Sequence, residues 1–183
     1  MTIDGGNGVC WTRIVKPFNL CNNFLGIAMI QILKARLEDM EAILKLQYAA
    51  FHSEALIHND FTIQPLTQTL EESIEEYHKC VVLKACIAYG EIVGSIRAYL
   101  ADDTAHIGKV MVHPDHQGKG LGRKLLAAIE REFPGKKYEL RTSSKSERNL
   151  YFYETSGYVR FREDTDVSGI KFVYLRKEPL RSS

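Results

Sequence analysis

Residues 109–126 read KVMVHPDHQGKGLGRKLL, and the fold and the site are decided in this stretch. An apolar, strand-like segment stops at Pro114, glycines follow at alternate positions from Gly118 to Gly122, and an amphipathic helical pattern begins at Leu121. Glycine adopts backbone conformations that other residues avoid, and it lets a ligand approach the chain closely. The first N–H groups of a helix have no partner within it and lie at the positive end of its dipole. The stretch therefore predicts a phosphate-binding turn.

The charge and spacing of this turn narrow the choice of ligand. Lys119, Arg123 and Lys124 place basic side chains beside it. A Walker A loop is excluded because no glycine precedes Lys-Ser or Lys-Thr at the required spacing. A dinucleotide-binding fingerprint is excluded because Arg123 occupies the position of its third glycine. A glycine-rich connection without any ligand stays open as the alternative.

Outward from the turn, strand-like and helix-like segments alternate. Strands are predicted over 30–36, 80–89, 91–101, 105–112, 137–142, 158–162 and 170–176, and helices over 38–53, 67–79, 121–133 and 146–155. This mixture of hairpins and helical crossovers predicts an α+β domain with a mixed sheet rather than a doubly wound parallel sheet. Residues 1–28 have no clean period, so we expect an N-terminal extension followed by a single domain over 29–183.

Composition argues against several classes of protein. The 24 basic and 23 acidic residues give a net charge of +1, which disfavours a nucleic-acid binder that depends on phosphate contacts. The most apolar window, residues 24–33, is too short to span a bilayer, which needs about 20 apolar residues. The four cysteines form no CxxC pair and have no histidine at zinc-ligand spacing. We therefore expect reduced thiols in a cytoplasmic protein, with no metal and no membrane segment.

Two motifs resemble those of one enzyme family. The turn at Gln117–Gly122 matches the (Arg/Gln)-x-x-Gly-x-(Gly/Ala) signature of the GNAT superfamily of N-acetyltransferases, and it follows a strand ending in Val-x-Val-x-Pro at Pro114, as in that family. Residues 146–158, SERNLYFYETSGY, resemble the second signature, Asn-x-x-x-Tyr-Glu-x-x-Gly-(Tyr/Phe). Over roughly residues 30–177 the chain resembles a small bacterial-type member. The resemblance implies a central, mostly antiparallel sheet of six to seven strands flanked by about four helices.

The resemblance also implies a co-substrate, acetyl-CoA, and the residues that would hold it. Backbone groups of Val110, Met111 and Val112 would pair with the pantetheine amides and polarise the thioester carbonyl, where negative charge develops. Asn149 would bond the cofactor's arm, assisted by Ser146. The pyrophosphate would lie on the N–H groups of the turn and beside its basic residue, namely Gln117, Gly118, Lys119, Gly120, Leu121, Gly122 and Arg123.

Catalytic roles follow from the same resemblance. Tyr153 matches the tyrosine that protonates the departing thiolate in many members, and a phenol with a pKa near 10 is protonated at neutral pH. The general base is expected around the helix end and loop His52–His58, with Glu54 as the first candidate and His52 and His58 behind it. We expect direct transfer without an acyl-enzyme, with Cys80 as a small core residue rather than a nucleophile, and likewise Cys86.

The predicted function is transfer of the acetyl group of acetyl-CoA to a primary amine of an unidentified small molecule or peptide. The alternatives are a protein acetyltransferase acting on an N-terminus or a lysine, and a non-catalytic acyl-CoA-binding module. The glutamates at 71, 72, 75 and 76 are interpreted as the solvated face of a helix rather than as an attraction for a cationic amine. No nucleic-acid or membrane partner is expected, and a homodimer stays open because no sequence feature identifies an interface.

Overall fold

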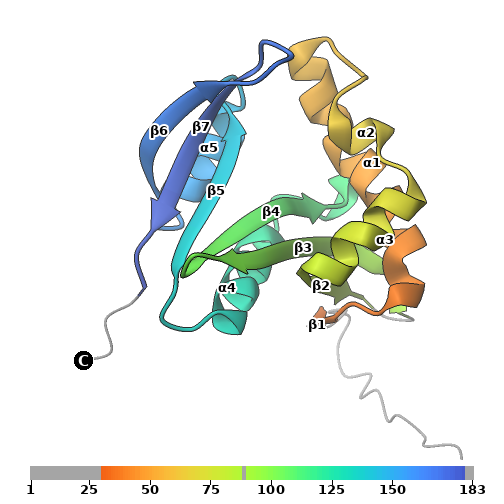
Figure 1. Cartoon of the computed structure of the whole chain (residues 1–183). Helices are drawn as coiled ribbons and strands as arrows, with labels where there is room; N and C mark the ends of the chain where they lie inside the picture. Colours follow the sequence, from red (N-terminus) through yellow and green to blue (C-terminus); the bar gives the residue numbers. More distant parts are fainter. Residues whose placement is uncertain (1–29, 88–89, 180–183) are drawn as a thin grey trace, which may run out of the picture.

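A seven-stranded sheet forms the centre of the computed structural model, which describes residues 30–87 and 90–179 (Figure 1). The strands are β1 (Gln31–Lys34), β2 (Val81–Cys86), β3 (Ile92–Ala101), β4 (Thr104–Val112), β5 (Lys137–Ser143), β6 (Val159–Thr165) and β7 (Lys171–Lys177). They lie in the order β1-β2-β3-β4-β5-β7-β6. Every neighbouring pair is antiparallel except β4 and β5. The predicted α+β fold with a mixed, mostly antiparallel sheet is confirmed. The extension expected over residues 1–28 lies outside the described residues.

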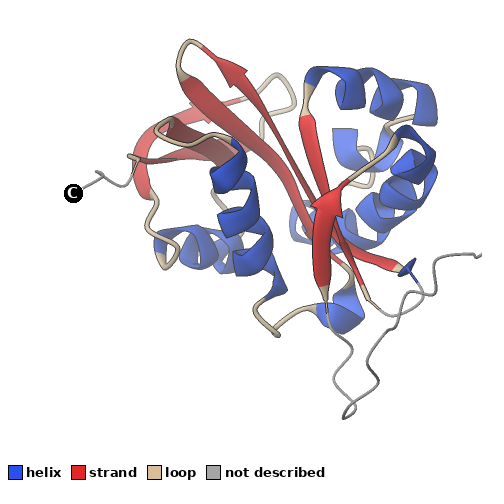
Figure 2. Cartoon of the chain, turned by 90° about the horizontal axis from the view of Figure 1, so that it is seen from below, coloured by secondary structure: helices blue, strands red, loops and turns tan. Residues whose placement is uncertain are grey.

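Helices cover both faces of the sheet (Figure 2). They are α1 (Met40–His58), α2 (Gln64–Thr67), α3 (Leu70–Lys79), α4 (Leu121–Glu132) and α5 (Glu147–Glu154), with 3-10 turns η1 (Leu37–Asp39) and η3 (Pro114–His116). On one face, Met40 and Ile43 of α1 pack with Met111 of β4. On the other face, Leu125 of α4 and Leu150 of α5 belong to the larger core cluster. The amphipathic stripes of the helices thus build two cores, one on each side of the strands. Within the described residues, no helix has the length and apolar character to cross a membrane.

The parallel pair β4–β5 is short, and this opens the sheet. Pairing runs only from Thr104 with Lys137 to His106 with Glu139, although both strands continue well beyond that point. Figure 1 shows β4 and β5 diverging from their paired ends. A bulge in β4 accompanies the divergence, because Arg97 of β3 pairs with Gly108 whereas Ser95 pairs with Met111. The sheet is therefore divided into two arms, β1–β4 and β5–β7–β6.

Two predicted helix boundaries are wrong. The first helix does not stop near Ser53 but continues to His58, so the loop expected within His52–His58 is helical. It ends where Asn59 takes a left-handed conformation with φ of 49°, which asparagine tolerates. The helix predicted from Thr67 begins at Leu70, because the Thr69 side chain accepts a hydrogen bond from the N–H of Glu72 in a capping box. The segment before it forms the separate short helix α2.

Candidate active site

The glycine turn joins the end of β4 to the start of α4. Gly118 and Gly120 have φ values of 74° and 76°, a left-handed conformation that explains the glycines. The side chain of Gln117 folds back, and its Nε2 donates to the carbonyl oxygen of Val112 at 3.0 Å. Lys119 Nζ donates to the carbonyl oxygen of Asp115 at 2.9 Å. These bonds fix the turn against the strand that precedes it.

The start of α4 leaves backbone donors available. Its first backbone hydrogen bond is donated by Lys124 to the carbonyl oxygen of Gly120. By helix geometry, the N–H groups of residues 121–123 therefore have no acceptor within the helix. A Cβ atom at Gly118 or Gly120 would meet nothing within 4 Å, so the space beside these donors is open. The turn thus has the donors, the dipole and the room that an anion such as a pyrophosphate requires.

At Gly122, the requirement for glycine comes from helix packing rather than from backbone conformation. A Cβ atom at this position would lie 3.3 Å from Cζ of Phe152, on α5. The absence of a side chain lets the first turn of α4 pack closely against α5. The two helices that carry the two sequence motifs are therefore in direct contact.

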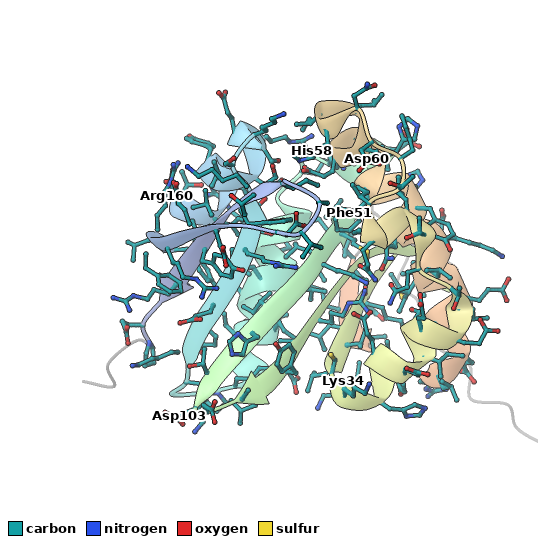
Figure 3. The ribbon with its side chains drawn as sticks, turned by 45° about the horizontal axis from the view of Figure 1, so that its top comes forward. Lys34, Phe51, His58, Asp60, Asp103 and Arg160 are labelled. Carbon is teal, nitrogen blue, oxygen red and sulfur yellow. The ribbon has the colours of Figure 1, made fainter. Side chains whose placement is uncertain are left out.

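A cleft of about 1730 Å³ lies between the two arms of the sheet. One side is formed by α1 and the segment after it, where Phe51, His58 and Asp60 lie (Figure 3), and Phe161 and Arg162 of β6 line the cleft as well. The cleft collects most of the predicted site residues: Glu54, Val110, Val112, Gln117, Gly118, Gly120, Leu121, Gly122, Arg123, Ser146, Asn149 and Tyr153. Met111 and Lys119 do not line it. The Met111 side chain is 1% exposed in the core below α1, and Lys119 turns back toward Asp115.

Glu54 lies against the beginning of α5. Its Oε1 accepts hydrogen bonds from Oγ of Ser146 at 2.8 Å and from Nδ2 of Asn149 at 2.9 Å. Because α1 continues to His58, Glu54 stands on a helix rather than in the expected loop, and that helix extends as far as α5. Of the three candidates for the base, the structure places Glu54 beside the second motif. His58 lines the cleft farther along, whereas His52 is outside the lining and packs at a tilt against the ring of Phe61.

Tyr153 lies on the face of α5 that points into the cleft and the core. Its side chain is 8% exposed and packs against Phe152 and Tyr158, with ring centroids 4.9 and 6.2 Å away. Burial strongly raises the pKa of Tyr153, and the Glu54 carboxylate raises it further because it repels a phenolate. The hydroxyl therefore stays protonated across the whole physiological pH range.

A polar cluster under α3 was not predicted from the sequence. One oxygen of Glu76, Oε2, accepts from Arg97, from Lys109 at 3.0 Å and from Nε2 of Gln68 at 2.6 Å. Arg97 also donates to Oε1 of Gln47 at 2.8 Å. The interpretation of all four glutamates as a solvated face is wrong for Glu76, because a helical pattern alone does not reveal the two cations that the sheet places beneath it.

The buried lysine of this cluster predicts a pH effect on stability. Burial, and then repulsion by Arg97, lower the pKa of Lys109 to about 8. An unfolded lysine keeps its proton until about pH 10.4, so between these values the unfolded state binds more protons and stability rises with pH. Relative to Lys109→Met, the wild type should gain at most about 3 kcal/mol of unfolding free energy over this window. Urea titrations at several pH values measure the free energy of unfolding of both proteins. If it changed equally with pH in the wild type and in Lys109→Met, the lowered pKa of Lys109 would be contradicted.

Comparisons with known proteins place the chain in a family. The model of the acetyltransferase (GNAT) domain matches residues 47–179, well over half of the chain. The chain therefore belongs to the GNAT acetyltransferases, and the resemblance drawn from the two motifs is confirmed. No curated protein sequence matches the chain. In the described residues, no group of three or more His, Cys, Asp or Glu side chains could hold a metal ion.

Solved structures share the fold at low sequence identity. PaiA N-acetyltransferase from Thermoplasma acidophilum, in complex with coenzyme A, superposes with a TM-score of 0.63 at 17% identity, covering 82% of this chain and 99% of its own. YncA from Salmonella typhimurium, with its cofactor acetyl-CoA, gives 0.65 at 20% identity, covering 85% and 97%. The ribosomal-protein-S18-alanine N-acetyltransferase from Escherichia coli gives 0.63 at 16% identity, covering 85% and 97%.

Proposed function

We propose that this protein transfers the acetyl group of acetyl-CoA directly to a primary amine of a small molecule or peptide, in the cytoplasm. The observation that carries the proposal is the meeting of three features in one cleft: the anion-binding turn, the free edge of β4, and Tyr153 with Glu54. Membership of the GNAT family supports it, and so do the cofactors held by the structures of PaiA and YncA. The described cysteines, Cys80 and Cys86, are free thiols, which agrees with a reducing compartment.

The residues present fit acetyl-CoA. The turn from Gln117 to Gly122 would take the pyrophosphate, with Arg123 beside it. Backbone groups of Val110, Met111 and Val112 would pair with the pantetheine arm along the edge of β4 that β5 leaves unpaired, and Asn149 would face it from α5, with Ser146 next to it. When bound, acetyl-CoA supplies an activated thioester. Acetyl-CoA would thus be held by backbone hydrogen bonds along β4 and by the anion site at the glycine turn.

The side chains at the centre can carry out the proton transfers that the reaction requires. The amine is protonated at neutral pH, and we assign removal of its first proton, which frees the nitrogen to attack the carbonyl carbon, to the carboxylate of Glu54, which later releases that proton to solvent. As the carbon–sulfur bond breaks, Tyr153 donates its proton to the departing sulfur, and its oxygen takes back the second proton of the nitrogen. Backbone N–H groups of β4 stabilise the negative charge on the carbonyl oxygen during transfer. The charges balance without an acyl-enzyme, so neither cysteine takes part.

Binding and turnover test this function separately. Acetyl-CoA and CoA should both raise the melting temperature, since a ligand at about 100 times its Kd adds about 2.7 kcal/mol to stability. Thiol release from acetyl-CoA should then require an added amine, offered as polyamines, amino acids, peptides and antibiotics. Stabilisation without release by any amine would favour the acyl-CoA-binding module. If neither cofactor moves the melting temperature at millimolar concentration, the proposal is wrong.

Glu54→Gln is expected to lower kcat/KM near neutral pH by about 100-fold, the lower end of the range for a general base. Glutamine keeps an oxygen that can accept from Ser146 and Asn149, so the local geometry is retained while the basicity is lost. The deficit should shrink as the pH approaches the pKa of the amine, because a neutral amine needs no base.

The measurement is a pH profile of both proteins, with Glu41→Gln on the exposed face of α1 as the matched control. That control should behave like the wild type. An equal loss at every pH would show that Glu54 has only a structural part.

A further inference from the structure

The cluster formed by Gln47, Gln68, Glu76, Arg97 and Lys109 lies on the wall of the cleft. Arg97, Lys109 and Glu76 line the cleft. The Arg97 and Lys109 side chains are nevertheless only 7% and 11% exposed, whereas that of Glu76 is 39% exposed. We call these five residues the α3 cluster. It combines nearly buried cations, which are uncommon, with access to a ligand cavity.

The charges of the α3 cluster do not balance. Glu76 is the one carboxylate that contacts the two cations among the described residues. Its hydrogen-bonding partners and the cations lower the pKa of Glu76, although burial opposes them, so it is ionised. Cys80 also acts on both cations, and burial raises the pKa of its thiol, which therefore stays neutral. Two positive charges thus share one negative charge. A net positive charge held away from water is costly unless a counter-charge reaches it.

Hydrogen-bonding capacity is also left over. An ammonium group has three N–H donors, and Lys109 uses two, toward Gln68 at 2.5 Å and Glu76 at 3.0 Å. A guanidinium group has five, and the described partners of Arg97 are Glu76 and Gln47. The unused donors belong to the two groups whose charge is in excess. A carboxylate would meet both needs at once, because it accepts hydrogen bonds from lysine and arginine and brings the missing charge.

The position of the α3 cluster separates it from the anion site at the glycine turn. Lys109 stands in the bulge of β4 with φ of 49°, and it directly precedes Val110, the start of the edge assigned to the pantetheine. Its side chain is directed toward α3, on the face where Met111 packs against α1. Val110 and Val112 pack on the opposite face, in the core with α4. The α3 cluster is therefore placed beside the reacting end of the cleft and away from the turn that receives the pyrophosphate.

We propose that Arg97 and Lys109 bind a carboxylate of the acetyl acceptor, so that the acceptor is an amino acid or a peptide with a nearby carboxylate rather than a polyamine. This inference rests on the proposed function, since it describes the other substrate of the same cleft. A polyamine would bring further positive charge to a wall that already has an excess of it. The carboxylate anchors the acceptor, and its amine extends along β4 toward Glu54.

The first test compares acceptors with and without a carboxylate, and kcat/KM is referred to the neutral form of each amine. Glycine, β-alanine, 4-aminobutyrate and 6-aminohexanoate are offered with acetyl-CoA, each beside its primary amide, and spermidine is included as the polyamine. At the best spacing, kcat/KM for the acid should exceed that for the amide by at least about tenfold, the equivalent of one charge-assisted hydrogen bond. Equal rates for acid and amide at every spacing, or a preference for spermidine, would overturn the proposal.

The second test removes the cation. Lys109→Met should abolish the preference for the acid mainly through KM, so that the acid and its amide are used with similar kcat/KM. The matched control is Lys136→Met, at the turn before β5, where the lysine pairs with Asp103 outside the cleft. Equal losses with acid and amide would show that Lys109 only supports the fold.

Binding of the products gives a readout that needs no turnover. Calorimetry with the N-acetylated form of the best acid and of its amide should show tighter binding of the acid to the wild type and no difference with Lys109→Met. If the acid binds in this way while no amine releases thiol, the carboxylate site stands and the proposed transfer fails. If amines release thiol without any preference for a carboxylate, the transfer stands and this inference fails.

Discussion

Gly120→Glu is expected to weaken the binding of both acetyl-CoA and CoA by about a thousand-fold or more, or at least about 4 kcal/mol. The new carboxylate would stand at the positive end of α4, where it satisfies the free N–H groups and repels a pyrophosphate. The space beside Gly120 is open, so the side chain can enter it without displacing the core. Its φ of 76° adds strain of about 1–2 kcal/mol, a loss of stability that a folded domain can tolerate. Calorimetry with CoA measures the effect.

Gly135→Glu is the matched control for this substitution. Gly135 has φ of 72°, a Cβ atom at this position would meet nothing within 4 Å, and the residue lies in the turn after the other end of α4. The control imposes the same strain and the same charge outside the cleft. It should keep the affinity of the wild type, and both variants should keep the circular dichroism spectrum of a folded protein. Wild-type affinity in Gly120→Glu would mean that the pyrophosphate binds elsewhere.

Tyr153→Phe is expected to lower kcat by about a thousand-fold, within the range for loss of a general acid, while leaving the Kd of acetyl-CoA nearly unchanged. The ring remains, so its packing against Phe152 and Tyr158 is preserved. Because burial strongly raises the pKa of Tyr153, the wild-type profile should show no tyrosine-dependent loss of rate below about pH 10. Single-turnover kinetics with a good acceptor isolate the transfer step from product release.

Tyr151→Phe, on the same helix, provides the comparison. The Tyr151 side chain is 69% exposed, and its hydroxyl should have no part in transfer. Its kcat should match the wild type. A full rate in Tyr153→Phe would show that solvent protonates the thiolate, and a loss confined to cofactor affinity would make Tyr153 a binding residue instead.

Local signals in the sequence predicted the glycine turn and most of the elements. The left-handed conformations of Gly118 and Gly120 follow from residue type, and α4 begins at Leu121 as its apolar spacing predicts. The end of α1 was missed because polar residues follow Phe51 at positions 52–54 and interrupt the apolar stripe, whereas the last turns are held by the burial of Ala55. Strand ends were also shifted by a few residues, most clearly in β6, which continues to Thr165.

Features that depend on distant pairing could not be predicted in this way. Glu54 meets Ser146 and Asn149 across 92 and 95 residues of chain, and no local pattern records such a contact. The resemblance to a family named the residues, and the structure adds that they lie together. Glu76 is the opposite case. The sequence suggested that it was solvated, because Glu71 and Glu75 on the same helix are exposed. The pairing of β3 with β4 instead places Arg97 and Lys109 against its carboxylate. Helical periodicity describes a single helix and does not predict which residues of the sheet contact it.

The contact between Gly122 and Phe152 has a consequence for how this sequence can change during evolution. A Cβ at position 122 would lie 3.3 Å from the Phe152 ring, so a side chain there requires the ring to shift by a few tenths of an ångström, and the two sites are coupled. In homologues with alanine at the first site, a smaller or differently turned side chain is expected at the second. Paired substitutions at these two positions would preserve the spacing of α4 and α5, and thereby the distance between the glycine turn and Tyr153.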